Sequence, residues 1–133
     1  MTDISDSGTD VLAIKDGLIQ RPIPTAWRSV LSNIVNAFAH RDYSLKVGVV
    51  GVTMFSLSTP QHIEEYIVDY NATLIALPDE TWDTSVCIWS GNHWDVLVDL
   101  WTQEEGRSDM VLSLRVTETK SGFLFGVYMV YVP

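Results

Sequence analysis

Apolar and polar residues alternate along the second half of the chain, and this alternation predicts β-strands. In two runs, residues 94–100 and 110–116, every second residue is apolar: Trp94, Val96, Val98 and Leu100, then Met110, Leu112, Leu114 and Val116. Because successive side chains of a strand point to opposite faces, each run places these residues on one inward face. Residues 123–132 are apolar on both faces apart from a glycine and the tyrosines, which predicts a well-covered central strand. The three runs together predict a C-terminal β-meander.

The two alternating runs also predict how their strands pair. If both inward faces contact the same core, Leu100 lies opposite Met110 in an antiparallel hairpin. The same register places Asp95 opposite Arg115 on the outward face, where the two form an ion pair, and it leaves residues 103–107 as a five-residue loop. The ion pair supports this register, because the alignment of the apolar residues did not require it.

Turn-forming residues delimit further strands upstream of the meander. A glycine followed by an asparagine at residues 91–92 is typical of a two-residue hairpin turn, which would pair Trp89 with Trp94. The valine-rich stretch 45–55 is interrupted by two glycines, which favours an irregular strand over a helix. Residues 73–77 predict a short strand that stops at the following proline.

Two stretches have the period of an amphipathic helix. The first begins at Thr25 and runs for about 15 residues, with an apolar face made of Trp27, Val30, Leu31, Ile34, Val35 and Phe38. The second begins at Thr59-Pro60, a capping residue followed by a proline, and ends near Asn71, a residue that tolerates a left-handed conformation. The elements predict one α+β domain over residues 25–133, with two helices packed on one face of a mostly antiparallel sheet. Residues 1–24 are expected to form an N-terminal tail and a segment that wraps the surface.

Composition restricts the partners and the compartment. The 133 residues are 47% hydrophobic, which suits one compact core. Seventeen acidic residues against eight Lys and Arg give a net charge of -9, which argues against nucleic-acid binding. The one cysteine, Cys87, lies in an apolar run and suits a reducing compartment. The start of the chain has neither feature of a secretory signal, and no run of about 18 apolar residues occurs. These features predict a cytoplasmic protein without a membrane partner.

The densest group of charged residues is DLWTQEEGRSD, residues 99–109, between the two alternating runs. It could be a turn in which Gly106 takes a positive φ and Arg107 pairs with an acid. It could be catalytic, as a metal-assisted hydrolase, through the carboxylates of Asp99, Glu104, Glu105 and Asp109. The rest of the chain lacks zinc-ligand spacing, a nucleophile elbow and a phosphate loop, and the histidines lie on different elements: His40, His62 and His93. We therefore expect no cofactor, no metal and no enzymatic activity.

A third interpretation of this group is a binding surface, and the distribution of charge favours it. Residues 64–109 contain eleven acids and one base, a local balance of -10, while the rest of the chain sums to +1. Acids mixed with exposed aromatic residues attract and then anchor a basic protein. The expected contact residues are Trp101, Asp99, Glu104, Glu105, Asp109 and Arg107. Two alternatives are that the N-terminal segment covers this face, or that it holds a homodimer together.

Residues 94–112, together with the first helix, resemble an uncharacterised family of small bacterial proteins that carry a DLWTxEEGRSD signature near the C-terminus. The resemblance covers residues from about 25 to 133 and implies no activity. In size, charge and build the chain is also similar to bacterial immunity proteins, which neutralise toxins, although no motif is shared. We therefore expect an immunity protein that blocks a basic toxin, for example a nuclease.

Overall fold

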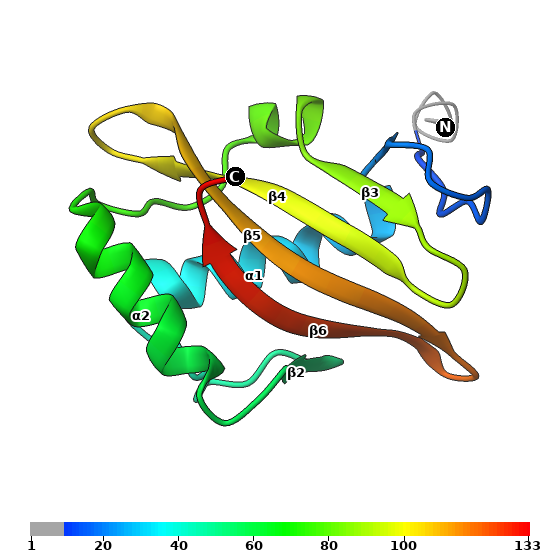
Figure 1. Ribbon diagram of the computed structural model, residues 1–133, viewed down its shortest axis with the longest axis horizontal. Coiled ribbons are helices and arrows are strands. Elements are labelled where there is room, and N and C mark those ends of the chain that lie inside the picture. Colours follow the sequence, from blue (N-terminus) through cyan, green and yellow to red (C-terminus); the bar gives the residue numbers. More distant parts are fainter. Residues whose placement is uncertain (1–9) are drawn as a thin grey trace, which may run out of the picture.

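Residues 10–133, which the computed structural model describes, contain a six-stranded sheet with the order β1-β3-β4-β5-β6-β2 (Figure 1). All neighbouring strands are antiparallel except β2, which runs parallel to β6. The strands are β1 (Arg21–Pro22), β2 (Val52–Met54), β3 (Val86–Trp89), β4 (Trp94–Thr102), β5 (Gly106–Thr119) and β6 (Gly122–Tyr131). The helices are α1 (Arg28–Ala39) and α2 (Thr59–Tyr70), with short 3-10 helices η2 (Thr25–Trp27) and η3 (Asp79–Asp83).

Both α-helices pack on one face of the sheet, so the predicted α+β class is confirmed. α1 buries Leu31, Ile34 and Phe38 completely or nearly so, and α2 buries Ile63. They contact the inward residues of the long strands, which form one hydrophobic cluster with them. Each fully buried side chain of this kind contributes about 1.5–3 kcal/mol relative to its exposed state. The alternation read from the sequence is therefore the pattern that holds the layers together.

The opposite face of the sheet carries no helix within residues 10–133. In Figure 1, α1 crosses behind β4 and β5, so the face toward the viewer is this outward face. Residues 10–24 do not cover it, and the tail predicted at the start of the chain lies, for residues 1–9, outside the described residues. The Leu18 N–H donates to the Trp89 carbonyl, and the Trp94 indole N–H donates to the Ile14 carbonyl. Because Trp94 points into the core, residues 10–24 follow the helix side and the β3 edge, and the outward face stays open.

The register between the strands is mostly as predicted, with one correction at the β4–β5 turn. Trp89 pairs with Trp94, and Asp95 pairs with Arg115. The predicted pairing of Leu100 with Met110 and the five-residue loop are wrong, because Thr102 pairs with Gly106 and leaves a three-residue turn. The extra residues form a bulge in β5 instead. The Ser108 hydroxyl stabilises this bulge, because it donates to the Leu100 carbonyl (2.7 Å) and accepts the Met110 N–H (3.1 Å).

Three predicted strands differ from the observed ones. Only Val52–Met54 of the stretch 45–55 is a strand, because Leu45 and the two glycines of this stretch have positive φ angles. Residues 73–77 make a single bridge, between Leu74 and Thr102. β6 lies inside the sheet, yet β2 accompanies it for only three residues, and its outward Leu124 is 45% exposed. The last strand is therefore covered on the inward face alone.

The ends of α2 are close to the prediction. Asn71 takes the expected left-handed conformation, with φ 63° and ψ 42°. At the start, Thr59 is the first helical residue and Ser58 is the capping residue, one position earlier than predicted. The Thr59 hydroxyl accepts a hydrogen bond from the Ser56 N–H (3.1 Å), so it orders the loop before the helix.

Candidate functional site

The predicted contact residues all lie at the turn between β4 and β5 or beside it. β4 alternates strictly to its end, so Trp101 points outward and Thr102, which is buried, points inward. The turn that follows continues this division. The Glu104 and Glu105 side chains reach toward the end of α2, on the same side as Thr102. Arg107, which pairs with Trp101, lies on the open face.

Glu105 is bound on the helix side of the turn. Its carboxylate accepts the Tyr70 hydroxyl of α2 (2.9 Å) and the Thr102 hydroxyl (3.1 Å). The Tyr70 oxygen in turn accepts the backbone N–H of Asp109 (3.2 Å). That N–H is the largest single influence and lowers the pKa of Tyr70, but burial and the Glu105 carboxylate outweigh it and raise the pKa. The phenol therefore keeps its proton and stays a donor to Glu105.

Glu104 is bound in the same way to the loop after α2. Its carboxylate accepts the Thr73 backbone N–H (2.8 Å) and the Thr73 hydroxyl (2.9 Å). These two bonds, the backbone one first, lower the pKa of Glu104. Glu104 and Glu105 thus tie the turn to the C-terminal end of α2, and we call these two residues with Tyr70 and Thr73 the clasp.

Asp99 has a structural role on the other side of β4, where η3 approaches. Its carboxylate accepts a short hydrogen bond from the Thr84 hydroxyl. Its backbone carbonyl accepts the Thr81 hydroxyl (2.7 Å), and its N–H donates to Ser85 Oγ (2.9 Å). Where β3 has ended, the edge of β4 is therefore hydrogen-bonded by hydroxyl groups instead of by a neighbouring strand, and all of these bonds are made to Asp99.

Three of the predicted contact residues have side chains without such structural hydrogen bonds: Trp101, Arg107 and Asp109. Trp101 and Arg107 pair across the hairpin, so both point to the open face. The Trp101 ring lies against Gly106, whose φ is 76° and where an added Cβ would be 3.7 Å from the ring. Within residues 10–133, Arg107 makes no ion pair, so the expected clasp by this residue is replaced by the two glutamates. The Asp109 side chain is exposed.

The geometry does not gather the acids into a metal site. Asp99 faces η3, whereas Glu104 and Glu105 face α2. No group of three or more His, Cys, Asp or Glu side chains suited to a metal occurs in the described part of the chain. The metal-assisted hydrolase interpretation therefore gains no support from the arrangement of its four carboxylates.

Sequence reasoning missed the partners of these acids. Tyr70, Thr73 and Thr84 are separated from the acids that they bind by 15 to 35 positions along the chain. The inward position of Thr102 was the available signal, because it implies that the residues directly after it turn toward the helices. The identity of the partners depends on where α2 ends, which the alternation of the strands does not specify.

The fold and the site define an α+β protein with two helices on one face of its sheet, an open second face, and an acidic turn clasped to α2. A model of the family described as "Domain of unknown function (DUF7668)" matches residues 35–133, and the chain belongs to this family. This confirms the resemblance to an uncharacterised family. No curated protein and no solved structure matches the chain. In residues 10–133, no helix has the length and the hydropathy needed to cross a membrane.

Proposed function

We propose that this protein is an inhibitor of the immunity type, which binds a basic protein toxin on its open sheet face. The observation that carries the proposal is the position of Trp101, a partly exposed tryptophan on an uncovered face and beside an acidic end. We place the inhibitor in the cytoplasm, because its lone buried Cys87 suits a reducing compartment.

The surroundings of Trp101 support the role of an anchor. Leu97, four residues before Trp101 on β4, points outward and is partly exposed, as is Tyr131 on β6, whereas Ile88 pairs with Asp95 near the other end of β4. Binding hot spots combine a central aromatic residue with neighbours that exclude water. A solvent-exposed face of this composition has unfavourable contact with water, which a partner would remove.

The Trp101 indole also has an unmet hydrogen bond. Its Nε1 atom is shielded from solvent and has no partner in the described part of the chain. An unpaired N–H of this kind costs about 1–3 kcal/mol. A rotation of the ring toward a carbonyl group of a bound protein would recover this energy, which favours binding at this position.

Charge supports a basic partner. The acidic side chains collect at the end of the sheet that holds the β4–β5 turn: those of α2 (Glu64, Glu65, Asp69), of η3 (Asp79, Glu80, Asp83), and Asp109 beside the turn. Lys120 lies beyond the opposite end of β5, which spans about 43 Å at 3.3 Å per residue. A surface polarised in this way steers a cationic protein to one end.

The experiment tests the products of the genes adjacent to this one as partners, and the proposal expects one of them to be a basic protein. We expect a complex whose affinity falls as salt rises from 50 to about 300 mM, chiefly through a slower association rate. Trp101→Ala should weaken the complex by about 2 kcal/mol or more, as loss of an anchor residue does. In cells, co-expression of the wild-type protein should restore growth against the toxin, and Trp101→Ala should not.

A matched pair of charge reversals tests the role of the acidic end. Asp109→Lys and Glu118→Lys change the net charge equally, but Asp109 lies beside the turn, whereas Glu118 lies at the opposite end of β5 and forms an exposed ion pair with Lys15 (2.7 Å) that its reversal removes. We expect Asp109→Lys to slow association much more than Glu118→Lys. Equal effects would remove the case for a polarised docking surface. A stable homodimer in sedimentation that Trp101→Ala dissociates would assign the open face to self-association instead.

A further inference from the structure

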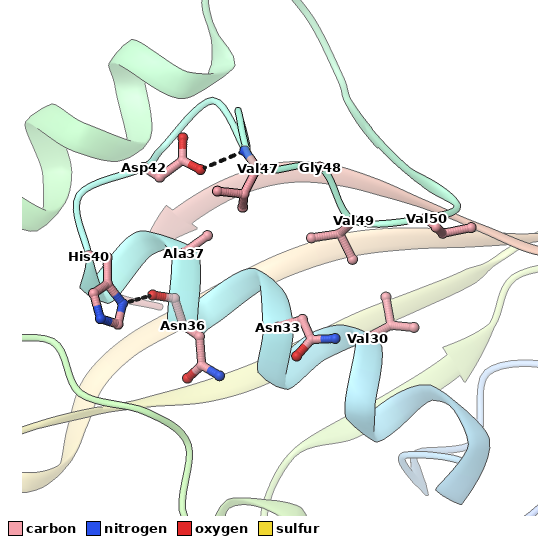
Figure 2. Close-up of a pocket in the computed structure, with 10 residues that line it drawn as sticks. All are labelled: Val30, Asn33, Asn36, Ala37, His40, Asp42, Val47, Gly48, Val49 and Val50. Atoms are coloured by element: carbon pink, nitrogen blue, oxygen red, sulfur yellow. Dashed lines mark hydrogen bonds between the residues drawn. The ribbon is translucent and has the colours of Figure 1, made fainter.

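A groove lies between the solvent side of α1 and the loop that leads to β2, away from the open sheet face. Its volume is about 550 Å³, within the range of ligand sites. Figure 2 shows α1 on one side, with Asn33 and Asn36, and the valines of the loop on the other. Val47 is 81% exposed and Val50 is 96% exposed, so they contribute almost nothing to the core.

We infer that this groove binds a short extended peptide segment, which carries small aliphatic side chains and has a positively charged residue at the end next to Asp42. The groove and Trp101 lie on different sides of the molecule, so the inference does not depend on the proposed inhibitor function.

The polar side of the groove fits a peptide main chain. Asn33, Asn36 and His40 follow one another along the same side of α1 and line the groove. Each asparagine amide has donors and an acceptor, as a peptide group does. The distance along the helix from residue 33 to residue 40 is about 10 Å at 1.5 Å per residue, which equals three residues of extended chain. The valines opposite would cover aliphatic side chains of that segment.

The charge of the groove selects the end group of the ligand. None of the residues that line it is Lys or Arg. The two Asp42 oxygens each accept one backbone N–H, from Lys46 (2.8 Å) and from Val47 (3.2 Å), which leaves further acceptor capacity on both. The backbone N–H of Lys46, and then that of Val47, lower the pKa of Asp42 against the effect of burial, so the carboxylate stays charged. The Lys46 ammonium makes no ion pair with it in the described chain, but its positive charge also helps to lower the pKa of Asp42.

His40 adds a second acceptor at this end. Its Nδ1 lies 2.8 Å from the Asn36 carbonyl oxygen. Because a carbonyl oxygen only accepts, Nδ1 carries the proton, and the other ring nitrogen of the neutral imidazole is an acceptor. An ammonium or guanidinium group would be attracted to Asp42, whereas a carboxylate would be repelled by it.

The backbone of the loop contains several residues with positive φ angles. Arg41 (φ 65°) and Leu45 (φ 57°) are left-handed although neither is glycine, and Gly48 and Gly51 follow with φ 78° and 79°. A positive φ is unfavourable for Arg41 and Leu45 but not for glycine, and at Arg41 it ends α1, because the Asp42 N–H donates to the Ala37 carbonyl (2.8 Å). The four residues fix the shape of the loop that carries the exposed valines.

The test uses an N-terminally fluorescein-labelled, C-terminally amidated peptide of sequence Gly-Gly-Val-Ala-Val-Lys, with anisotropy and 15N NMR as readouts. We expect saturable binding, with shifts at the side-chain amides of Asn33 and Asn36 and at the Gly48 N–H, and none at the Trp101 indole. Asn33→Ala should weaken binding about five-fold, the value of one hydrogen bond. Val50→Ser should also weaken it, and because that side chain is 96% exposed the fold should persist.

The controls separate recognition of the peptide from non-specific attraction. Asn92→Ala, in the exposed turn between β3 and β4, should leave the affinity unchanged. A peptide with Glu in place of Lys should bind at least about ten-fold more weakly, one decade being the effect of about 1.4 kcal/mol. The inference is overturned by the absence of binding at millimolar peptide, by equal binding of the Glu peptide, or by equal affinities of the Asn33→Ala and Asn92→Ala variants. Displacement of the peptide by an equal concentration of n-hexylamine would also overturn it, in favour of a small amine.

Discussion

Ser108→Ala tests how the β4–β5 hairpin reaches its three-residue turn. Ser108 is 7% exposed, and its hydroxyl bridges the Leu100 carbonyl and the Met110 N–H across the bulge. These backbone groups would otherwise have paired with each other in a regular ladder. Alanine fits the same space, since it removes only the oxygen, so the substitution isolates the two hydrogen bonds.

The expected loss of stability is large for one atom. A buried backbone group left without a partner costs about 1–3 kcal/mol. Leu100 and Met110 are both fully buried, so water reaches their backbone groups poorly. The two groups together predict a loss of about 2–6 kcal/mol, a substantial part of the 5–15 kcal/mol typical of a domain. For a chain of this size, such a loss lowers Tm by roughly 10 °C.

Urea unfolding followed by far-UV circular dichroism measures this loss. Ser113→Ala is the matched control, because Ser113 lies on the same strand and its side chain makes no hydrogen bond within residues 10–133. We expect the control to stay within about 0.5 kcal/mol of the wild type. Ser108→Ala with the stability of the control, at an unchanged m-value, would refute the account of the bulge.

Three further predictions concern single positions. Arg41→Gly should raise the free energy of unfolding by about 1 kcal/mol relative to Arg41→Ala, because a left-handed conformation is strained in any residue with a Cβ. The pKa of Glu104 is lowered by Thr73, so this residue stabilises the folded state above its unfolded-state pKa, and the contribution disappears as the pH falls through the lowered value. Urea midpoints from pH 6 to pH 3 should therefore fall more steeply for the wild type than for Glu104→Gln. Burial, and then the negative charge of Asp16, raises the pKa of Cys87 to about 11, so iodoacetamide at pH 8 should modify it quickly only after unfolding.

The fold was predictable wherever one face of an element is buried. A shift of one residue between β4 and β5 would expose the whole inward set, so the alternation restricted the pairing to registers that differ by two residues, and the predicted register is the observed one from Trp94 to Val98. The same reasoning located both helices. It failed where burial does not decide the conformation, as in the stretch 45–55, where left-handed residues end the strand, and at the β4–β5 turn, where one serine hydroxyl replaces the ladder.

The candidate site was predictable in place but not in its division of roles. Charge and composition identified the turn, and alternation placed Trp101 on the outward face. Whether an acid is free or bound depends on groups distant in sequence, such as Tyr70 at the end of α2. A carboxylate that accepts two hydrogen bonds is indistinguishable in the sequence from one that awaits a partner.

The difference between bound and free side chains changes what can be inferred from the DLWTQEEGRSD signature. Asp99 holds η3, the two glutamates hold α2, and Ser108 replaces backbone bonds, so much of the signature specifies how the hairpin is built. A protein that shares the signature is therefore expected to share this turn and its clasp, whatever it binds. Under the proposed function, recognition of a partner would fall to the residues that have no such role in the hairpin, which are Trp101, Arg107 and Asp109 together with the open face around them. Differences at these three positions, in proteins that keep the clasp, would then mark different partners on one scaffold.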